Sequence, residues 1–108
     1  MKITGLELFQ ISIPFARPYK LSKVYGTRYD AVSIIFKVHT DEGIVGLGEA
    51  DPLNPFTEET PASVMVVTRD LIAPLIIGQD PLKLSGLEHT LDMAVNANLV
   101  ARGAVNMA

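Results

Sequence analysis

Alternating apolar and polar positions in the first third of the chain predict β-strands. Residues 2–13 are mostly β-branched and aliphatic, but their apolar positions change parity, with Leu6 and Leu8 on one side and Phe9 on the other. Such a change of parity indicates a β-bulge near Leu8. Residues 30–40 alternate cleanly, which is typical of a half-buried antiparallel strand. The apolar face of this second strand comprises Val32, Ile34, Phe36 and Val38.

Turn signals separate the predicted strands. The segment 41–43 is a short turn that ends in glycine, so residues 44–49 are expected to return as a partner strand. Pro14 and Pro18 have no backbone N–H to donate to a sheet, so the first strand is expected to end there. A long polar loop should then run as far as Arg28. Together the three strands form a predicted antiparallel meander.

The second half of the chain has helical periodicity. Residues 50–61 contain three prolines and are expected to form a loop. Thr60 can act as N-cap for a helix over residues 61–73, which Pro74 should weaken. The predicted apolar stripe of this helix comprises Val64, Val67, Leu71 and Leu75.

Two further helices are predicted after it. The pair Asp80-Pro81 repeats the combination of cap and proline, and starts a helix that ends at residues 96–98. The third helix, over residues 99–108, has no glycine cap or polar tail, so we expect the chain to be a fragment of a longer protein. The fold class is therefore α+β, a three-stranded antiparallel meander followed by about three helices. The stripe of the second helix comprises Leu84, Leu87, Leu91 and Val95.

Composition removes several classes of function. With 108 residues, of which 48% are hydrophobic and 19% charged, the chain should form one globular domain. A net charge of −3 argues against nucleic acid or an anionic membrane as a partner. The chain has no cysteine for a disulfide or a thiolate metal site, and no apolar run of the roughly 18 residues that a membrane span requires. A cytoplasmic location is expected.

Familiar catalytic motifs are missing. His39 and His89 have no acidic or histidine neighbours at metal-ligand spacing, and both are interpreted as surface residues. The glycine-rich segment 43–48 fits neither phosphate-binding pattern and follows a hairpin turn. No serine lies in a G-x-S-x-G setting. We therefore expect no catalytic residue and no metal ligand in this chain.

Charge is distributed unevenly between the two long predicted loops. In one interpretation these charges are solvated or neutralise one another. In the other, the loops flank a site for a polar small molecule, whose walls would be Tyr19, Tyr25, Tyr29 and Phe56. The first loop contains the cations Arg17, Lys20, Lys23 and Arg28, and the second the anions Glu49, Asp51, Glu58 and Glu59.

Four segments carry a family resemblance, namely RPYKLS at 17–22, DEGIVGLGEA at 41–50, APLIIGQDP at 73–81 and ARGAVNMA at 101–108. In this order they resemble the N-terminal capping domain of the enolase superfamily, in its muconate lactonizing enzyme and mandelate racemase branch. The resemblance covers essentially the whole chain. It implies that residues 1–108 are the capping domain of a larger enzyme, with a C-terminal (β/α) barrel of about 250 residues.

The resemblance also implies a chemistry. Enzymes of this kind are Mg²⁺-dependent isomerases or lyases that remove the proton α to a carboxylate, and the metal stabilises the resulting enediolate. The base and the metal ligands would belong to the barrel. We therefore expect Mg²⁺ and a small carboxylate substrate in the full-length enzyme, which is also expected to be a homo-oligomer.

Two loops acquire a role from this resemblance, because the corresponding loops of the family cover the mouth of the barrel. They are residues 17–29 and 51–59. Glu49 matches a family glutamate at a strand end but is not assigned to metal binding. A non-catalytic binding or oligomerisation module, with the third helix packed on a partner chain, is the alternative. The candidate substrate-binding residues are Arg17, Tyr19, Lys20, Tyr25, Arg28, Asn54 and Phe56.

Overall fold

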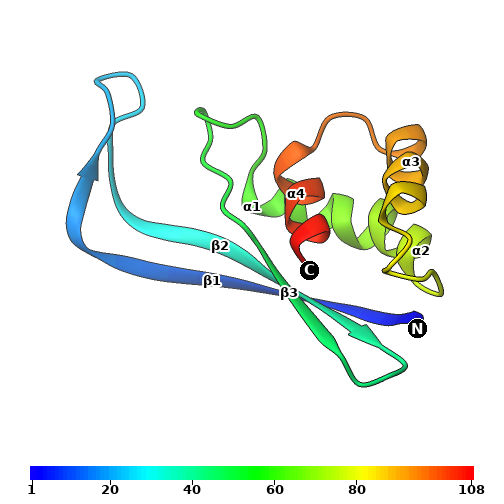
Figure 1. The fold of residues 1–108 in the computed structure, drawn as a ribbon. Helices are drawn as coiled ribbons and strands as arrows, with labels where there is room; N and C mark the ends of the chain where they lie inside the picture. The colour runs from blue at the N-terminus through cyan, green and yellow to red at the C-terminus, as the bar shows by residue number, and fades with distance from the viewer.

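The computed structural model describes residues 1–108 as a three-stranded antiparallel sheet with helices on one face (Figure 1). The strands are β1 (Ile3–Lys20), β2 (Thr27–Thr40) and β3 (Val45–Ala50), in the order β1-β2-β3. The predicted α+β class and the meander are confirmed. In Figure 1 the helices cover only part of the sheet, and the β1–β2 hairpin continues beyond them as a curved arm. This arm gives the molecule its elongated dimensions of 46 × 28 × 20 Å.

The prediction of a β-bulge near Leu8 is wrong. Pairing of β1 with β2 is regular from Gly5 to Pro14, and register shifts lie only on either side of this stretch. Leu8 is half-buried and packs against the core, whereas Phe9 is 44% exposed on the opposite face. The change of parity therefore reflects apolar residues on both faces of a regular strand.

The predicted loop from Arg17 to Arg28 is much shorter than expected. β1 continues through Pro14 and Pro18, and the loop that joins it to β2 comprises only residues 21–26. Because β1 is an edge strand, a missing N–H can face its unpaired side without cost to the sheet. Three of the four cations predicted to lie in this loop, Arg17, Lys20 and Arg28, therefore lie on the strands of the arm.

One helical stretch follows the loop of residues 51–60. It consists of α1 (Pro61–Val67), the π-helical segment η1 (Thr68–Ile72) and α2 (Ala73–Ile76). The predicted cap is confirmed, because the backbone N–H of Ser63 donates to Thr60 Oγ1 over 3.1 Å.

The helical stretch continues past its predicted end at residue 73. Pro74 lacks an N–H and would crowd a carbonyl of the preceding turn, and the wider π turn of η1 accommodates it. The wider turn also changes the buried side, so that Leu71 of the predicted stripe is 49% exposed. The observed buried stripe repeats every four residues and comprises Val64, Thr68, Ile72 and Ile76.

The second predicted helix begins later than expected. Asp80 accepts a hydrogen bond from the backbone N–H of Leu82 over 3.0 Å and so closes a separate turn, after which α3 (Leu84–Ala94) begins. Of its predicted stripe Leu91 and Val95 are buried, but Leu84 at the new helix start is 52% exposed.

The predicted break before the last helix is confirmed. Ala97 and Asn98 have φ angles of 53° and 54°, and α4 (Leu99–Met107) follows. None of the helices combines the length and the apolar character that a membrane-spanning segment needs.

The core lies between the helices and the inner face of the sheet. The predicted apolar face of β2 supplies Ile34, Phe36 and Val38, all of them buried. The helices contribute Val64, Ile72, Ile76, Leu91, Ala101 and Ala104, and Val95 directly after α3 is buried with them.

Helix α4 packs on β3 at backbone distance. A Cβ atom at Gly46 would overlap the carbonyl oxygen of Ala108, and one at Gly48 would overlap that of Ala104. The glycine-rich segment of the sequence therefore serves this close helix contact.

The N-terminus of α4 is capped from a distant part of the chain. Asn98 makes no capping hydrogen bond, and the carboxylate of Glu59, 4% exposed, takes its place. Glu59 accepts hydrogen bonds from the backbone N–H groups of Val100 over 2.7 Å and of Ala101 over 3.0 Å. Nothing in the local sequence pattern indicates this role, because it joins residues 41 and 42 positions apart.

Candidate functional site

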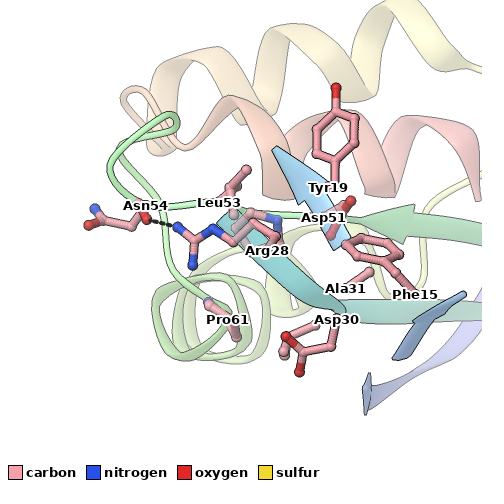
Figure 2. A pocket seen from close by; sticks show the side chains of 11 residues that line it. Phe15, Tyr19, Arg28, Asp30, Ala31, Asp51, Leu53, Asn54 and Pro61 are labelled. Atoms are coloured by element: carbon pink, nitrogen blue, oxygen red, sulfur yellow. Dashed lines mark hydrogen bonds between the residues drawn. The ribbon is translucent and has the colours of Figure 1, made fainter. Parts of the chain in front are cut away.

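A cleft of about 330 Å³ lies between the arm and the loop of residues 51–60 (Figure 2). It brings together three of the seven predicted substrate-binding residues, which are Tyr19, Arg28 and Asn54. Other residues that line it are Phe15, Asp30, Asp51 and Leu53.

Arg28 lines this cleft and connects its two sides. It pairs with Tyr19 across the arm, and its Nη2 donates a hydrogen bond of 2.7 Å to the backbone carbonyl oxygen of Asn54. Figure 2 shows the guanidinium reaching from β2 to the loop. Its Nε is enclosed and has no hydrogen-bond partner. The side chain is thus held in place by one long-range contact.

Two carboxylates line the cleft without pairing with Arg28. Asp30 accepts a hydrogen bond from Ser12 Oγ over 2.9 Å, and Asp51 accepts one from Ser33 Oγ over 3.3 Å. Arg28 takes part in no ion pair of the structure. The cleft therefore holds charges of both signs that are not directly matched.

The tips of the two segments touch through aromatic rings. Tyr25 and Phe56 lie edge to face, with ring centroids 5.5 Å apart and an interplanar angle of 84°. Neither ring lines the cleft, and Phe56 is 63% exposed. These two predicted residues therefore form a second bridge between the arm and the loop.

The remaining predicted residues lie outside the cleft. Arg17 and Lys20 are exposed on β1 and form no ion pair. Tyr29, proposed as a wall, is 67% exposed and does not line the cleft either.

The acids of the second loop have different environments. No ion pair joins them to the cations of the arm, so direct neutralisation does not describe this charge pattern. Glu59 caps α4, and Glu49 is exposed on β3. Asp51 is the only one of the four predicted acids that lines the cleft.

The ionisable residues offer no metal centre in this chain. No three His, Cys, Asp or Glu side chains lie close enough together to hold a metal ion. His39 of β2 pairs with Glu7 of the neighbouring strand β1, and His89 is exposed. The Mg²⁺ implied by the resemblance therefore has no ligand set among these residues.

The structure defines an α+β domain with a packed end and an arm bearing a cleft. Residues 4–108 match the domain described as "Mandelate racemase / muconate lactonizing enzyme, N-terminal domain". The chain belongs to this family of the enolase superfamily, and the resemblance noted from the sequence is confirmed.

Relatives with known activities are similar over the whole chain. The N-succinyl-L-Arg/Lys racemase of Bacillus cereus is 33% identical, with 100% of this chain and 29% of the racemase covered. Its crystal structure has a TM-score of 0.94 to this structure. The L-Ala-D/L-Glu epimerase of Bacillus subtilis is 30% identical, with a TM-score of 0.93 and coverage of 100% of this chain and 30% of the epimerase.

A further solved structure contains ligands. It is the dipeptide epimerase of Enterococcus faecalis complexed with Mg and the dipeptide L-Leu-L-Tyr, 28% identical, with a TM-score of 0.87 and coverage of 97% and 29%. The chain spans about 29% of the length of the curated relatives it matches.

Proposed function

We propose that residues 1–108 are the capping and substrate-specificity domain of a longer enzyme whose chemistry lies in a C-terminal barrel. The observation that carries this proposal is the similarity of the whole chain to the N-terminal domains of racemases and epimerases. The cleft and the aromatic tip pair agree with a role in binding. The absence of a group of metal-ligating side chains in this chain agrees with catalytic machinery elsewhere in the protein.

The proposed reaction is Mg²⁺-dependent removal of the proton α to the carboxylate of a small substrate, in an isomerase or a lyase. An α-proton is weakly acidic, so the developing oxyanion needs concentrated positive charge, which Mg²⁺ supplies when bound. The complex of a related epimerase with Mg and a dipeptide supports this chemistry. The residues of this chain would bind the substrate and exclude water.

Seven residues are proposed to form the side of this domain that faces the substrate. Tyr19, Arg28 and Asn54 would do so from the cleft, and Tyr25 and Phe56 from the tips of the two segments. The other two, Arg17 and Lys20, are exposed cations that would attract an anionic substrate over a distance.

Solvent exchange tests the proposed reaction without knowledge of the product. The full-length protein would be incubated in D₂O with Mg²⁺ and a panel of N-acyl amino acids, dipeptides and muconolactones. We expect loss of the α-proton signal of at least one of these compounds, and no such loss after chelation. Turnover that persists without divalent metal would contradict the proposal.

Homo-oligomer formation and a cytoplasmic location remain predictions. The outer face of the sheet offers an apolar surface for self-association, since Phe9, Ile13 and Leu47 are 44%, 51% and 62% exposed. Analytical ultracentrifugation of the full-length protein would measure its oligomeric state. A monomer at all concentrations would also exclude the alternative of an oligomerisation module.

A further inference from the structure

We propose that Arg28 is a positioning residue, which joins the arm and the loop of residues 51–60 into one unit, instead of a direct ligand of the substrate. This inference rests on the proposed function for its kinetic consequence, but not for its structural one. It starts from the hydrogen bond of 2.7 Å between Arg28 Nη2 and the carbonyl oxygen of Asn54.

The loop itself is closed by its own hydrogen bonds. The backbone N–H of Leu53 donates to Thr57 Oγ1 over 2.9 Å, and that of Thr57 donates to the carbonyl of Leu53 over 2.7 Å. Thr57 Oγ1 donates in turn to the carbonyl of Glu59 over 3.1 Å. A loop closed in this way moves as a body, so contacts at its surface decide its position.

Both ends of the loop are anchored on the packed part of the molecule. Glu59 binds the N-terminus of α4, and Asp51 accepts a hydrogen bond from the buried Ser33. The motion left to the loop is a tilt toward or away from the arm. Across that gap the structure provides the hydrogen bond from Arg28 and the edge-to-face contact of Tyr25 with Phe56.

Arg28 is suited to this task by its surroundings. Asp30 and Asp51 line the same cleft, but neither forms an ion pair with Arg28, whose guanidinium donates to Asn54 instead. Neighbouring atoms enclose the Nε of Arg28, and its Nη2 reaches the carbonyl of Asn54 (Figure 2). A planar guanidinium that donates to the Asn54 carbonyl holds a direction that a flexible ammonium would not.

The kinetic consequence of removing Arg28 should differ from that of removing a cation that binds the substrate directly. If Arg28 acts through the loop, its removal weakens binding of every substrate whatever its charge. A hydrogen bond to a charged group contributes enough for roughly a tenfold or larger effect. We expect Arg28→Ala and Arg28→Gln to raise KM about tenfold, both for substrates with an anionic side chain and for substrates with a neutral one. The value of kcat should change less than about twofold.

The structural consequence can be measured without substrate. This chain has no cysteine, so spin labels can be placed at Lys23→Cys on the arm and Glu58→Cys on the loop of the full-length protein, after replacement of any cysteine elsewhere in it. Double electron–electron resonance should give one narrow distance distribution in the parent. We expect a broad one in both Arg28 variants, and an unchanged one in the matched control Lys20→Ala.

The outcomes separate the two proposals. Unchanged narrow distributions in both Arg28 variants would overturn the positioning role. A rise in KM confined to substrates with an anionic side chain would also overturn it and would indicate direct contact of Arg28 with the substrate. Broad distributions with unchanged KM would confirm the positioning role and contradict the proposed function of the loop.

Discussion

The two ends of the sheet differ in how closely their elements meet. At one end α4 lies so near β3 that the chain requires glycine at Gly46 and Gly48. At the other, the arm and the loop leave a cleft of about 330 Å³ and touch through one charged hydrogen bond and one aromatic pair. The same strands thus support a packed core at one end and an adaptable surface at the other.

This difference has a physical cause. The packed end buries small residues such as Ala101 and Ala104 against bare backbone, so any added atom meets a carbonyl that cannot move. The open end presents long polar and aromatic side chains whose contacts can change without loss of the core. Substitutions at the two ends should therefore affect different measurements.

The largest effect should come from the packed end. In Gly48→Ala the new Cβ would overlap the carbonyl oxygen of Ala104, so α4 must move off the sheet. We expect a loss of about 3 kcal/mol in the free energy of unfolding, measured by urea denaturation.

Gly103→Ala is the matched control, because it lies on α4 itself with no atom within 4 Å of the added Cβ. It should stabilise the helix by about 1 kcal/mol. Equal effects of the two substitutions would show that the close contact of α4 with β3 is unimportant.

A smaller loss is expected at the cap of α4. Glu59→Ala removes both acceptors of the Val100 and Ala101 N–H groups and should cost about 2 kcal/mol. Hydrogen exchange at these two amides should accelerate. The neighbouring Glu58, which is exposed, provides the control Glu58→Ala with an effect below about 0.5 kcal/mol. Unchanged exchange at the two amides in Glu59→Ala would refute the capping role.

The aromatic pair should affect substrate binding more than stability. Tyr25→Leu and Phe56→Leu remove the edge-to-face contact, and a double-mutant cycle on kcat/KM should give a coupling of about 1 kcal/mol. Strictly additive effects would mean that the two rings act independently.

The smallest effect is expected from the exposed cations. Lys20→Ala removes a charge without an ion pair and should lower kcat/KM about threefold at low salt and negligibly at high salt. Lys83→Ala, an exposed lysine before α3, serves as control. A loss that persists at high salt would indicate a direct contact of Lys20 with the substrate.

The sequence predicted the parts of the fold that local patterns determine. The turn at residues 41–43 and the Thr60 cap each follow from a few adjacent residues, and both were found. The predicted apolar face of β2 was found at Ile34, Phe36 and Val38, whereas Val32 is only half-buried. The predictions failed where the surrounding structure overrode a local rule. Because β1 is an edge strand, it continues past Pro14, and because of the π turn in η1, the helical stretch continues past Pro74.

The site was predictable only in outline. The sequence indicated that the arm and the loop belong together, but not the contact of Arg28 with a backbone carbonyl, since a carbonyl has no sequence signature. Local sequence does not distinguish Glu59 from the other acids of the loop, because the helix that it caps begins about 41 residues away. Both interactions depend on tertiary placement.

We expect the open end of the molecule, and not the packed end, to respond to the substrate. Hydrogen exchange of the full-length protein with and without a substrate that it turns over tests this most directly. We expect added protection within residues 19–28 and 51–60, and none within β3 or α4. Protection confined to β3 and α4, or absent from both segments of the open end at saturating substrate, would contradict the account.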